Sequence, residues 1–173
     1  SYINIGNVYL SNGVLDQALA YYQKALALSL EILGPNHPDI ASSYNNIGAV
    51  YHDKGSYDQA LANYQKALTI RLEALGPSHE KVATSYHNIG NVYYNKDSYD
   101  QALANYQKAL AIKLATLSPN HLDVAAGYHN IGVVYMAQRD YDRALAYFEK
   151  CLSIEIPDYV SPDQYVGLNV TSL

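Results

Sequence analysis

Residues 44–68 read YNNIGAVYHDKGSYDQALANYQKAL, and this stretch decides the fold. In its first half, residues fall at the spacing i, i+3, i+4, i+7, which is one face of an α-helix, at Tyr44, Ile47, Gly48 and Tyr51. A glycine inside a helix costs about 1 kcal/mol relative to alanine. Gly48 therefore predicts that another helix approaches closely, and Gly55 predicts where the first helix ends.

The second half of the stretch, residues 56–68, predicts a second helix that packs against the first. Ser56 at the start and Gln59 three residues later predict a capping box. Alternating small and large apolar residues then predict a closely packed, buried stripe formed by Ala60, Tyr64, Ala67 and Leu68. The unit is thus a pair of antiparallel helices.

The same two-helix pattern recurs along the chain with a period of 42 residues. Residues 98–110 repeat residues 56–68 without a change, and the chain begins inside one copy, as expected for a fragment of a longer protein. Periods of about 20–50 residues indicate repeat architectures. We therefore expect one array over residues 1–156, with units of about 1–42, 43–84, 85–126 and 127–156.

Between the units lies a joint whose first copy, residues 33–41, reads LGPNHPDIA and at first resembles a catalytic or metal site. Residues 75–83 and 117–125 repeat its histidine, but only the first copy has the complete His-Pro-Asp. Gly34 is expected to end one helix, and Pro38 to begin the next, with the preceding histidine as a cap. We therefore expect a structural joint without catalytic or metal-binding residues.

The pattern Tyr-x-x-Ile-Gly-x-x-Tyr-x-x-x-Gly-x-Tyr-x-x-Ala-x-x-x-Tyr-x-x-Ala resembles the tetratricopeptide repeat. The long period and the Leu-Gly-x-x-His-Pro-Asp joint resemble the kinesin light chain subclass of that family. The resemblance implies an all-α fold, a right-handed superhelical solenoid of antiparallel helix pairs. It also implies a non-enzymatic scaffold that binds an extended peptide segment of a partner protein in its concave groove.

The resemblance places the binding residues on the first helix of each unit, where family members use an asparagine to hold a peptide backbone. An asparagine side chain offers a donor and an acceptor, as a peptide group does. The alternative is that these asparagines bond a neighbouring repeat or cap a loop. The candidate peptide-binding residues are these asparagines and their neighbours, namely Asn46, Asn88, Asn130, Asn45, His87, His129, Asn91, Tyr94 and His52.

The candidate positions carry no Lys or Arg, so they predict a neutral, polar and aromatic groove. A clamp for acidic C-termini needs basic side chains, and the acidic cargo motifs that kinesin light chains read are disfavoured for the same reason. His87 and His129 lie on adjacent units and suggest a pH-sensitive contact or a metal site. Without a third ligand, we expect no metal and no cofactor.

Composition narrows the function classes further. The chain has 173 residues and a net charge of −5, which argues against binding to duplex nucleic acid. No apolar run approaches the roughly 20 residues of a membrane span, so no membrane partner is expected. The single cysteine, Cys151, stands where Ala67 stands in an earlier unit, so we expect it to be buried and inert in a cytoplasmic protein. No catalytic constellation appears, which predicts a protein that is not an enzyme.

Residues 157–173 depart from the repeat, because Pro157 and Pro162 end the last helix. This tail is expected either to cap the array or to occupy the groove of its own or a neighbouring molecule. The near-identical copies also allow molecules to stack end to end. Self-association is therefore the alternative to binding a peptide of another protein.

Overall fold

A computed structural model describes residues 1–156, which form eight helices and no strand within that range. In chain order these are α1 (Tyr2–Ser11), α2 (Leu15–Leu33), α3 (Pro38–Asp53), α4 (Tyr57–Leu75), α5 (Glu80–Asn95), α6 (Tyr99–Thr116), α7 (Leu122–Ala137) and α8 (Tyr141–Glu155). Our expectations for the tail, a cap or a segment in a groove, concern residues 157–173 and lie outside the described residues.

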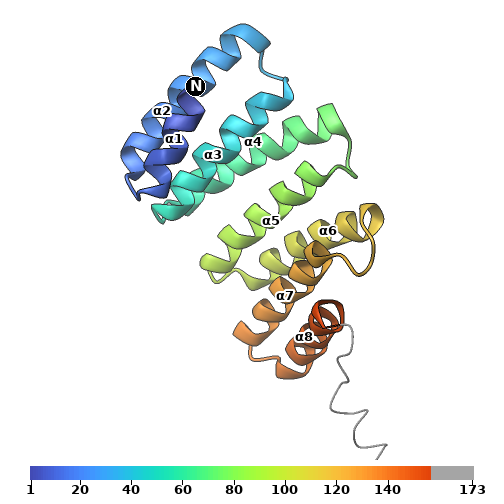
Figure 1. Cartoon of the computed structure of the whole chain (residues 1–173). Coiled ribbons are helices and arrows are strands. Elements are labelled where there is room, and N and C mark those ends of the chain that lie inside the picture. The colour runs from blue at the N-terminus through green and yellow to red at the C-terminus, as the bar shows by residue number, and fades with distance from the viewer. Residues whose placement is uncertain (157–173) are drawn as a thin grey trace, which may run out of the picture.

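The helices pack as four pairs, α1 with α2, α3 with α4, α5 with α6 and α7 with α8, and each pair is joined by a three-residue turn. Successive pairs stack along the chain into a superhelix (Figure 1). Each second helix also packs against the first helix of the next pair, and the hydrophobic clusters along the array share the partly buried rings of Tyr51 and Tyr93. The predicted all-α superhelical solenoid is confirmed.

A close contact between a glycine and an aromatic ring holds each helix pair together. A Cβ atom at Gly48 would lie 2.8 Å from the ring of Tyr64, and one at Gly90 would lie 2.7 Å from the ring of Tyr106. These distances are too short for any real Cβ, so an alanine would displace the ring. The close approach predicted from the helical glycines is confirmed, and it recurs in the pairs Gly6–Tyr22 and Gly132–Phe148.

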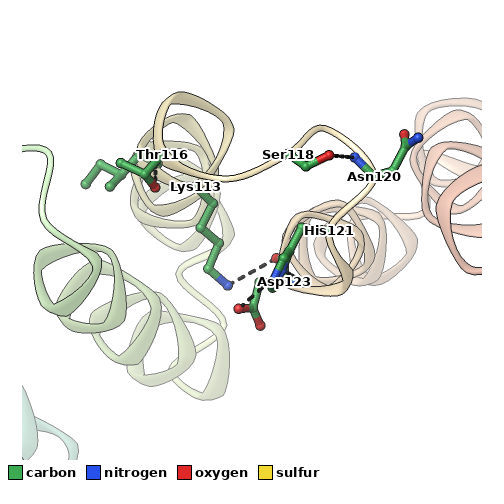
Figure 2. A network of polar contacts seen from close by, with 7 residues as sticks. Lys113, Thr116, Ser118, Asn120, His121 and Asp123 are labelled. Atoms are coloured by element: carbon green, nitrogen blue, oxygen red, sulfur yellow. Dashed lines mark hydrogen bonds and ion pairs between the residues drawn. The ribbon is translucent and has the colours of Figure 1, made fainter.

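The histidine of each joint caps the helix that follows it. Nδ1 of His37 accepts a hydrogen bond of 3.2 Å from the backbone N–H of Asp39, and the second joint is capped in the same way. Figure 2 shows the third joint, where Nδ1 of His121 accepts from the N–H of Asp123 at 3.1 Å. Lys113 reaches across from α6 and donates to the Asp123 carbonyl at 3.1 Å. The structural interpretation of the joint is confirmed.

The capping boxes predicted for the second helices do not form. Ser56 and Ser98 are the N-cap residues of α4 and α6, but neither side chain accepts a hydrogen bond from the first turn. The ψ angle of Ser56 is 65°, well away from the extended conformation usual at an N-cap. Asp140 has a similar ψ of 77°, yet its longer side chain accepts a 3.1 Å bond from the N–H of Arg143. The prediction was wrong because serine is too short for this backbone.

Glycine ends α2 and α4 in a conformation that other residues rarely adopt. Gly34 has φ 78° and ψ 168°, and Gly76 has φ 80° and ψ 165°. Both glycines thus combine a positive φ with an extended ψ, a conformation that is essentially open to glycine alone. Ser118 stands at this position in the third joint, and α6 ends one residue earlier, at Thr116.

Candidate binding face on helices α3, α5 and α7

The candidate residues lie on the first helices of the second, third and fourth pairs. We call this surface the odd-helix face. All of its side chains are half-buried except that of His129, which is exposed, so they pack against neighbours and still reach solvent. It comprises Asn45, Asn46 and His52 of α3, His87, Asn88, Asn91 and Tyr94 of α5, and His129 and Asn130 of α7.

Two hydrogen bonds between units join four of these side chains in two pairs, Asn88 with Asn45 and Asn130 with His87. We call these two pairs the amide ladder. Nδ2 of Asn88 donates to Oδ1 of Asn45 on the preceding first helix, at 3.0 Å. One unit later, Nδ2 of Asn130 lies 3.2 Å from Nδ1 of His87. The alternative that asparagines bond a neighbouring repeat therefore holds for Asn88 and Asn130. Each carboxamide still has a second N–H and unused lone pairs on its oxygen.

Asn46 occupies the position of Asn88 and Asn130 in its own unit, but its side chain takes no part in the hydrogen bonds found among residues 1–156. The reason lies in the preceding unit, where Ile3 stands at the position of Asn45 and offers no polar group. The half-buried carboxamide of Asn46 therefore keeps its full capacity of two N–H donors and one oxygen acceptor.

His87 lies at the centre of the odd-helix face, between two carboxamides. Nδ2 of Asn91 lies 3.2 Å from Nε2 of His87, and Oδ1 of Asn91 accepts a 2.7 Å bond from the Tyr106 hydroxyl. Burial, followed by the charge of Lys113, lowers the pKa of His87. A neutral imidazole has one donor and one acceptor, so His87 accepts from only one of these two asparagines, and the tautomer decides which one.

The remaining candidates lie outside the amide ladder. Nε2 of His52 lies 2.8 Å from Nδ2 of Asn95, a cross-unit contact that the sequence reasoning missed although the 43-residue offset is that of the ladder. The ring of Tyr94 packs against that of Tyr99, with centroids 5.8 Å apart. His129 ends the row, where its ring packs on Phe148 at 5.5 Å.

Comparison with protein families identifies the family to which this chain belongs. The family model described as tetratricopeptide repeat matches residues 1–73, 39–115 and 81–154. The chain belongs to the tetratricopeptide repeat family. Its overlapping matches extend over nearly all of the described residues, in agreement with the repeats seen in the sequence and the helix pairs seen in the structure.

Two solved structures resemble this tetratricopeptide repeat protein along nearly its whole length. BtubC (BKLC) from P. vanneervenii superposes with a TM-score of 0.82 at 26% identity over 92% of this chain, which covers 65% of BtubC. A chain from Podosopora anserina, whose nearly identical TPR-like repeats are assigned to a kinesin light chain, gives 0.80 at 20% identity, with coverages of 95% and 79%. The second likeness shows the fold alone. No curated protein matches the chain.

Lysines at the ends of the odd helices of this tetratricopeptide repeat protein are paired. Nζ of Lys54 lies 2.5 Å from the carboxylate of Asp16, and Nζ of Lys96 lies 2.5 Å from that of Asp58. The fourth unit keeps the contact with Gln138 in place of the lysine. Such surface pairs add little stability, but they occupy two lysines at the ends of these helices. The face itself has no Lys or Arg.

Other chemistry on this repeat protein is sparse in the part of the chain that the structure describes. Among residues 1–156, no three His, Cys, Asp or Glu side chains gather in a way that could hold a metal ion. Cys151 is buried, and burial raises the pKa of its thiol, which disfavours the reactive thiolate. None of the eight helices is both long enough and apolar enough to cross a bilayer.

Proposed function

We propose that the odd-helix face binds an extended peptide segment of a partner protein. The tetratricopeptide repeat fold supports a role as a protein–protein interaction scaffold. The observation that carries the finer proposal is a half-buried carboxamide at one position of three successive units, at Asn46, Asn88 and Asn130. Because a carboxamide has the donor and acceptor of a peptide group, such a row suits a peptide backbone of almost any sequence.

The strength of these contacts favours reversible binding. One hydrogen bond between amides contributes about 1 kcal/mol net in water. Asn88 and Asn130 are each held by a cross-unit bond, which reduces the side-chain entropy lost when a ligand binds. Three such bonds, less the cost of ordering a flexible peptide, support an affinity no better than about micromolar.

Charge narrows the chemistry of the partner segment. The odd-helix face has no Lys or Arg, while the exposed carboxylate of Asp53 lies beside His52 at the end of α3. A segment rich in Asp and Glu would find no lysine or arginine on this face to pair with and would be repelled by Asp53. Tyr94 offers an aromatic surface for an apolar side chain. We therefore expect an uncharged or weakly basic partner segment.

The single buried cysteine fits a cytoplasmic location, where thiols stay reduced. In this proposal the protein acts by binding alone, without catalysis. A library of short random peptides, panned against the immobilised chain, tests it. Recovered peptides should be poor in Asp and Glu and should shift the NMR signals of the side-chain amides of Asn46, Asn88 and Asn130. Recovery of no peptide, or only of peptides that leave these signals unmoved, would contradict the proposal.

End-to-end self-association is the second candidate function, and an exposed apolar face on α1 and α2 favours it. Val8 is 60% exposed and Leu28 is 47% exposed. The equivalent residues one unit later, Val50 and Ile70, are 0% and 9% exposed. The α1–α2 face thus carries the residues of an interface between units, but within residues 1–156 no preceding helix pair covers it.

The opposite end of the array carries a matching surface on α8. Tyr141 and Leu145 are 64% and 59% exposed, whereas their counterparts Tyr99 and Leu103 pack against the hydrophobic cluster that the third and fourth pairs share. If α8 of one copy met the α1 of a second copy, the contact would repeat the interface within the chain and would be of the head-to-tail kind.

Sedimentation velocity over a range of concentrations tests this second candidate. The fraction of oligomers is expected to increase with protein concentration. Val8→Glu should abolish these oligomers because it would bury a charge in the end-to-end contact between copies. Leu122→Glu is the matched control, because Leu122 is equally exposed but lies outside both end faces. A wild-type chain that stays monomeric at high concentration would reject self-association.

A further inference from the structure

Each second helix points an aromatic ring at the first helix of its own pair, and in two units a tyrosine hydroxyl finds an asparagine there. The hydroxyl of Tyr22 donates to Oδ1 of Asn7 at 2.6 Å, and that of Tyr106 donates to Oδ1 of Asn91 at 2.7 Å. The asparagine lies 15 residues before the tyrosine in both units. A carboxamide on the first helix is therefore the built-in partner of this hydroxyl.

The fourth unit replaces both members of the pair together. Val133 stands where the asparagine would be, and Phe148, the only phenylalanine of the chain, takes the place of the tyrosine. With neither polar group present, no donor or acceptor is left without a partner in the packed interior. The chain thus keeps both members or neither in three of its four units.

The second unit keeps the hydroxyl without the carboxamide. Ala49 stands at the position of Asn91, whereas Tyr64 retains its hydroxyl. The Tyr64 ring packs over Gly48 as the other rings pack over their glycines, at 2.8 Å from an added Cβ, and its hydroxyl lies close enough to Asp53 of α3 to feel the charge of that carboxylate. Among residues 1–156, no hydrogen bond joins this hydroxyl to another group.

The Tyr64 hydroxyl is nearly enclosed but still reaches the surface. The side chain of Tyr64 is 5% exposed. Among the described residues, the only fully enclosed side-chain atom without a partner is Nε of Arg71, so the Tyr64 hydroxyl retains contact with solvent. Burial, followed by the charge of Asp53, raises the pKa of Tyr64 to about 12, so the hydroxyl is a proton donor at neutral pH.

We propose that a backbone carbonyl of the bound peptide accepts a hydrogen bond from the Tyr64 hydroxyl, as Oδ1 of Asn91 does from Tyr106. The inference rests on the proposed peptide binding and specifies where on the odd-helix face the backbone is anchored. The carbonyl of a peptide group and that of a carboxamide are equivalent acceptors. Asn45, which belongs to the amide ladder, lies one helical turn before Ala49 on α3. The Tyr64 hydroxyl that would hold the peptide therefore lies next to the amide ladder.

The chain itself supplies the conservative variants for a test. Tyr64→Phe removes the hydroxyl and reproduces the packing of Phe148 in the fourth unit. Ala49→Asn copies the arrangement of Asn91 and Tyr106 in the third unit. The new carboxamide would accept the hydrogen bond of the Tyr64 hydroxyl, which would then be unavailable to a peptide. Each variant repeats side chains that this fold already accommodates, and neither changes a residue of the amide ladder.

The probe is N-acetylglycine N-methylamide, a blocked residue with two peptide groups, titrated into protein labelled with ¹³C in its tyrosine rings. Tyr64→Phe identifies the Tyr64 signal by its loss. That signal should shift saturably in the wild type and stay in place in Ala49→Asn. The Tyr22 signal is the internal control and should not shift, because its hydroxyl is already bonded to Asn7, which lies outside the odd-helix face. Affinity measured at the Asn46 side-chain amide should fall about fivefold in Tyr64→Phe, as expected for one hydrogen bond.

A Tyr64 signal that moves no more than that of Tyr22, or that moves equally in Ala49→Asn, overturns the inference. The side-chain amide signals of Asn46 and Asn88, followed in the same titration, report on the proposed function separately. Shifts at these asparagines without a shift at Tyr64 overturn only the inference. The absence of a shift at all three residues overturns both proposals.

Discussion

The side-chain amide of Asn88 donates a 3.0 Å hydrogen bond to Oδ1 of Asn45, one helix pair earlier in the array. The same contact recurs one unit later between Asn130 and His87. The side chains that we propose as peptide contacts thus also join the units to each other. A substitution at Asn88 or Asn130 should therefore change both peptide binding and the stability of the fold. A substitution at Asn46, which has no such bond, should change peptide binding alone.

Replacing Asn45 with alanine should destabilise the protein by about 1 kcal/mol, because the half-buried amide of Asn88 loses its acceptor. Urea denaturation measures the change in the free energy of unfolding. Asn46→Ala is the matched control, since Asn46 lies at a comparable depth without a cross-unit bond, and its effect should stay within about 0.5 kcal/mol. Equal losses in the two variants would show that the cross-unit bond contributes nothing.

Introducing a partner for Tyr64 should stabilise the protein. Ala49→Asn recreates the Asn91–Tyr106 bond and should raise the free energy of unfolding by about 0.5–1.5 kcal/mol. Val133→Asn places the same side chain opposite Phe148, which has no hydroxyl, and should cost about 1–3 kcal/mol. Adding Phe148→Tyr should recover part of that loss. The account of this pairing fails if urea denaturation finds that Ala49→Asn destabilises the chain.

Arg71 should be among the most sensitive positions in the array. It is 5% exposed, and one guanidinium nitrogen donates to Oγ of Ser85 at 2.7 Å and to the Lys81 carbonyl at 3.1 Å. Arg71→Ala removes these bonds and leaves a cavity, for an expected loss of about 2–4 kcal/mol. Lys113 holds the next joint from a half-buried position, so Lys113→Ala should cost less than about 1 kcal/mol. Urea denaturation that ranks Lys113 above Arg71 would contradict this view.

Stability should decrease in mild acid because of His87. Burial, and then the charge of Lys113, lowers the pKa of His87 in the folded state, so the unfolded chain takes up the proton first as the pH falls. This contribution is fully present above the unfolded pKa of about 6.5 and is lost as the pH drops through that value toward the folded pKa. Urea midpoints measured from about pH 7.5 to about pH 5 follow it.

His87→Asn places the side chain of Asn45 at the equivalent position one unit later and should make stability less dependent on pH in this range. His129→Asn is the control, because His129 is exposed at the end of the row and has no hydrogen bond among the described residues. A pH dependence that is unchanged by His87→Asn would show that His87 does not contribute.

Sequence periodicity predicted the fold well because it depends on local spacing. The 3.6-residue period, the helical glycines and the histidine caps each involve residues within one unit, and all were found as expected. The capping boxes failed because they depend on the backbone angle at Ser56, which the residue types do not determine. The helix end at Gly34 was placed correctly.

The candidate face could be predicted only in part, because its hydrogen bonds cross between units. The sequence placed Asn88 and Asn45 on equivalent helices but left open whether the asparagines bond a ligand or a neighbouring repeat. The answer depends on how far successive pairs are rotated, which spacing alone does not give. The burial of Arg71 and the partner of Tyr106 were missed for related reasons. In the fourth unit Val133 and Phe148 replace the asparagine and the tyrosine together. This paired change was a signal that could have revealed the bond between Asn91 and Tyr106.

The most direct test of peptide binding by the odd-helix face is the dissociation constant of one library-selected peptide for the wild type and for Asn46→Ala. Asn46 is the informative position because its carboxamide makes no bond within residues 1–156. We predict binding about fivefold weaker in Asn46→Ala, equivalent to one net hydrogen bond, with an unchanged free energy of unfolding. A dissociation constant that does not change would contradict the account.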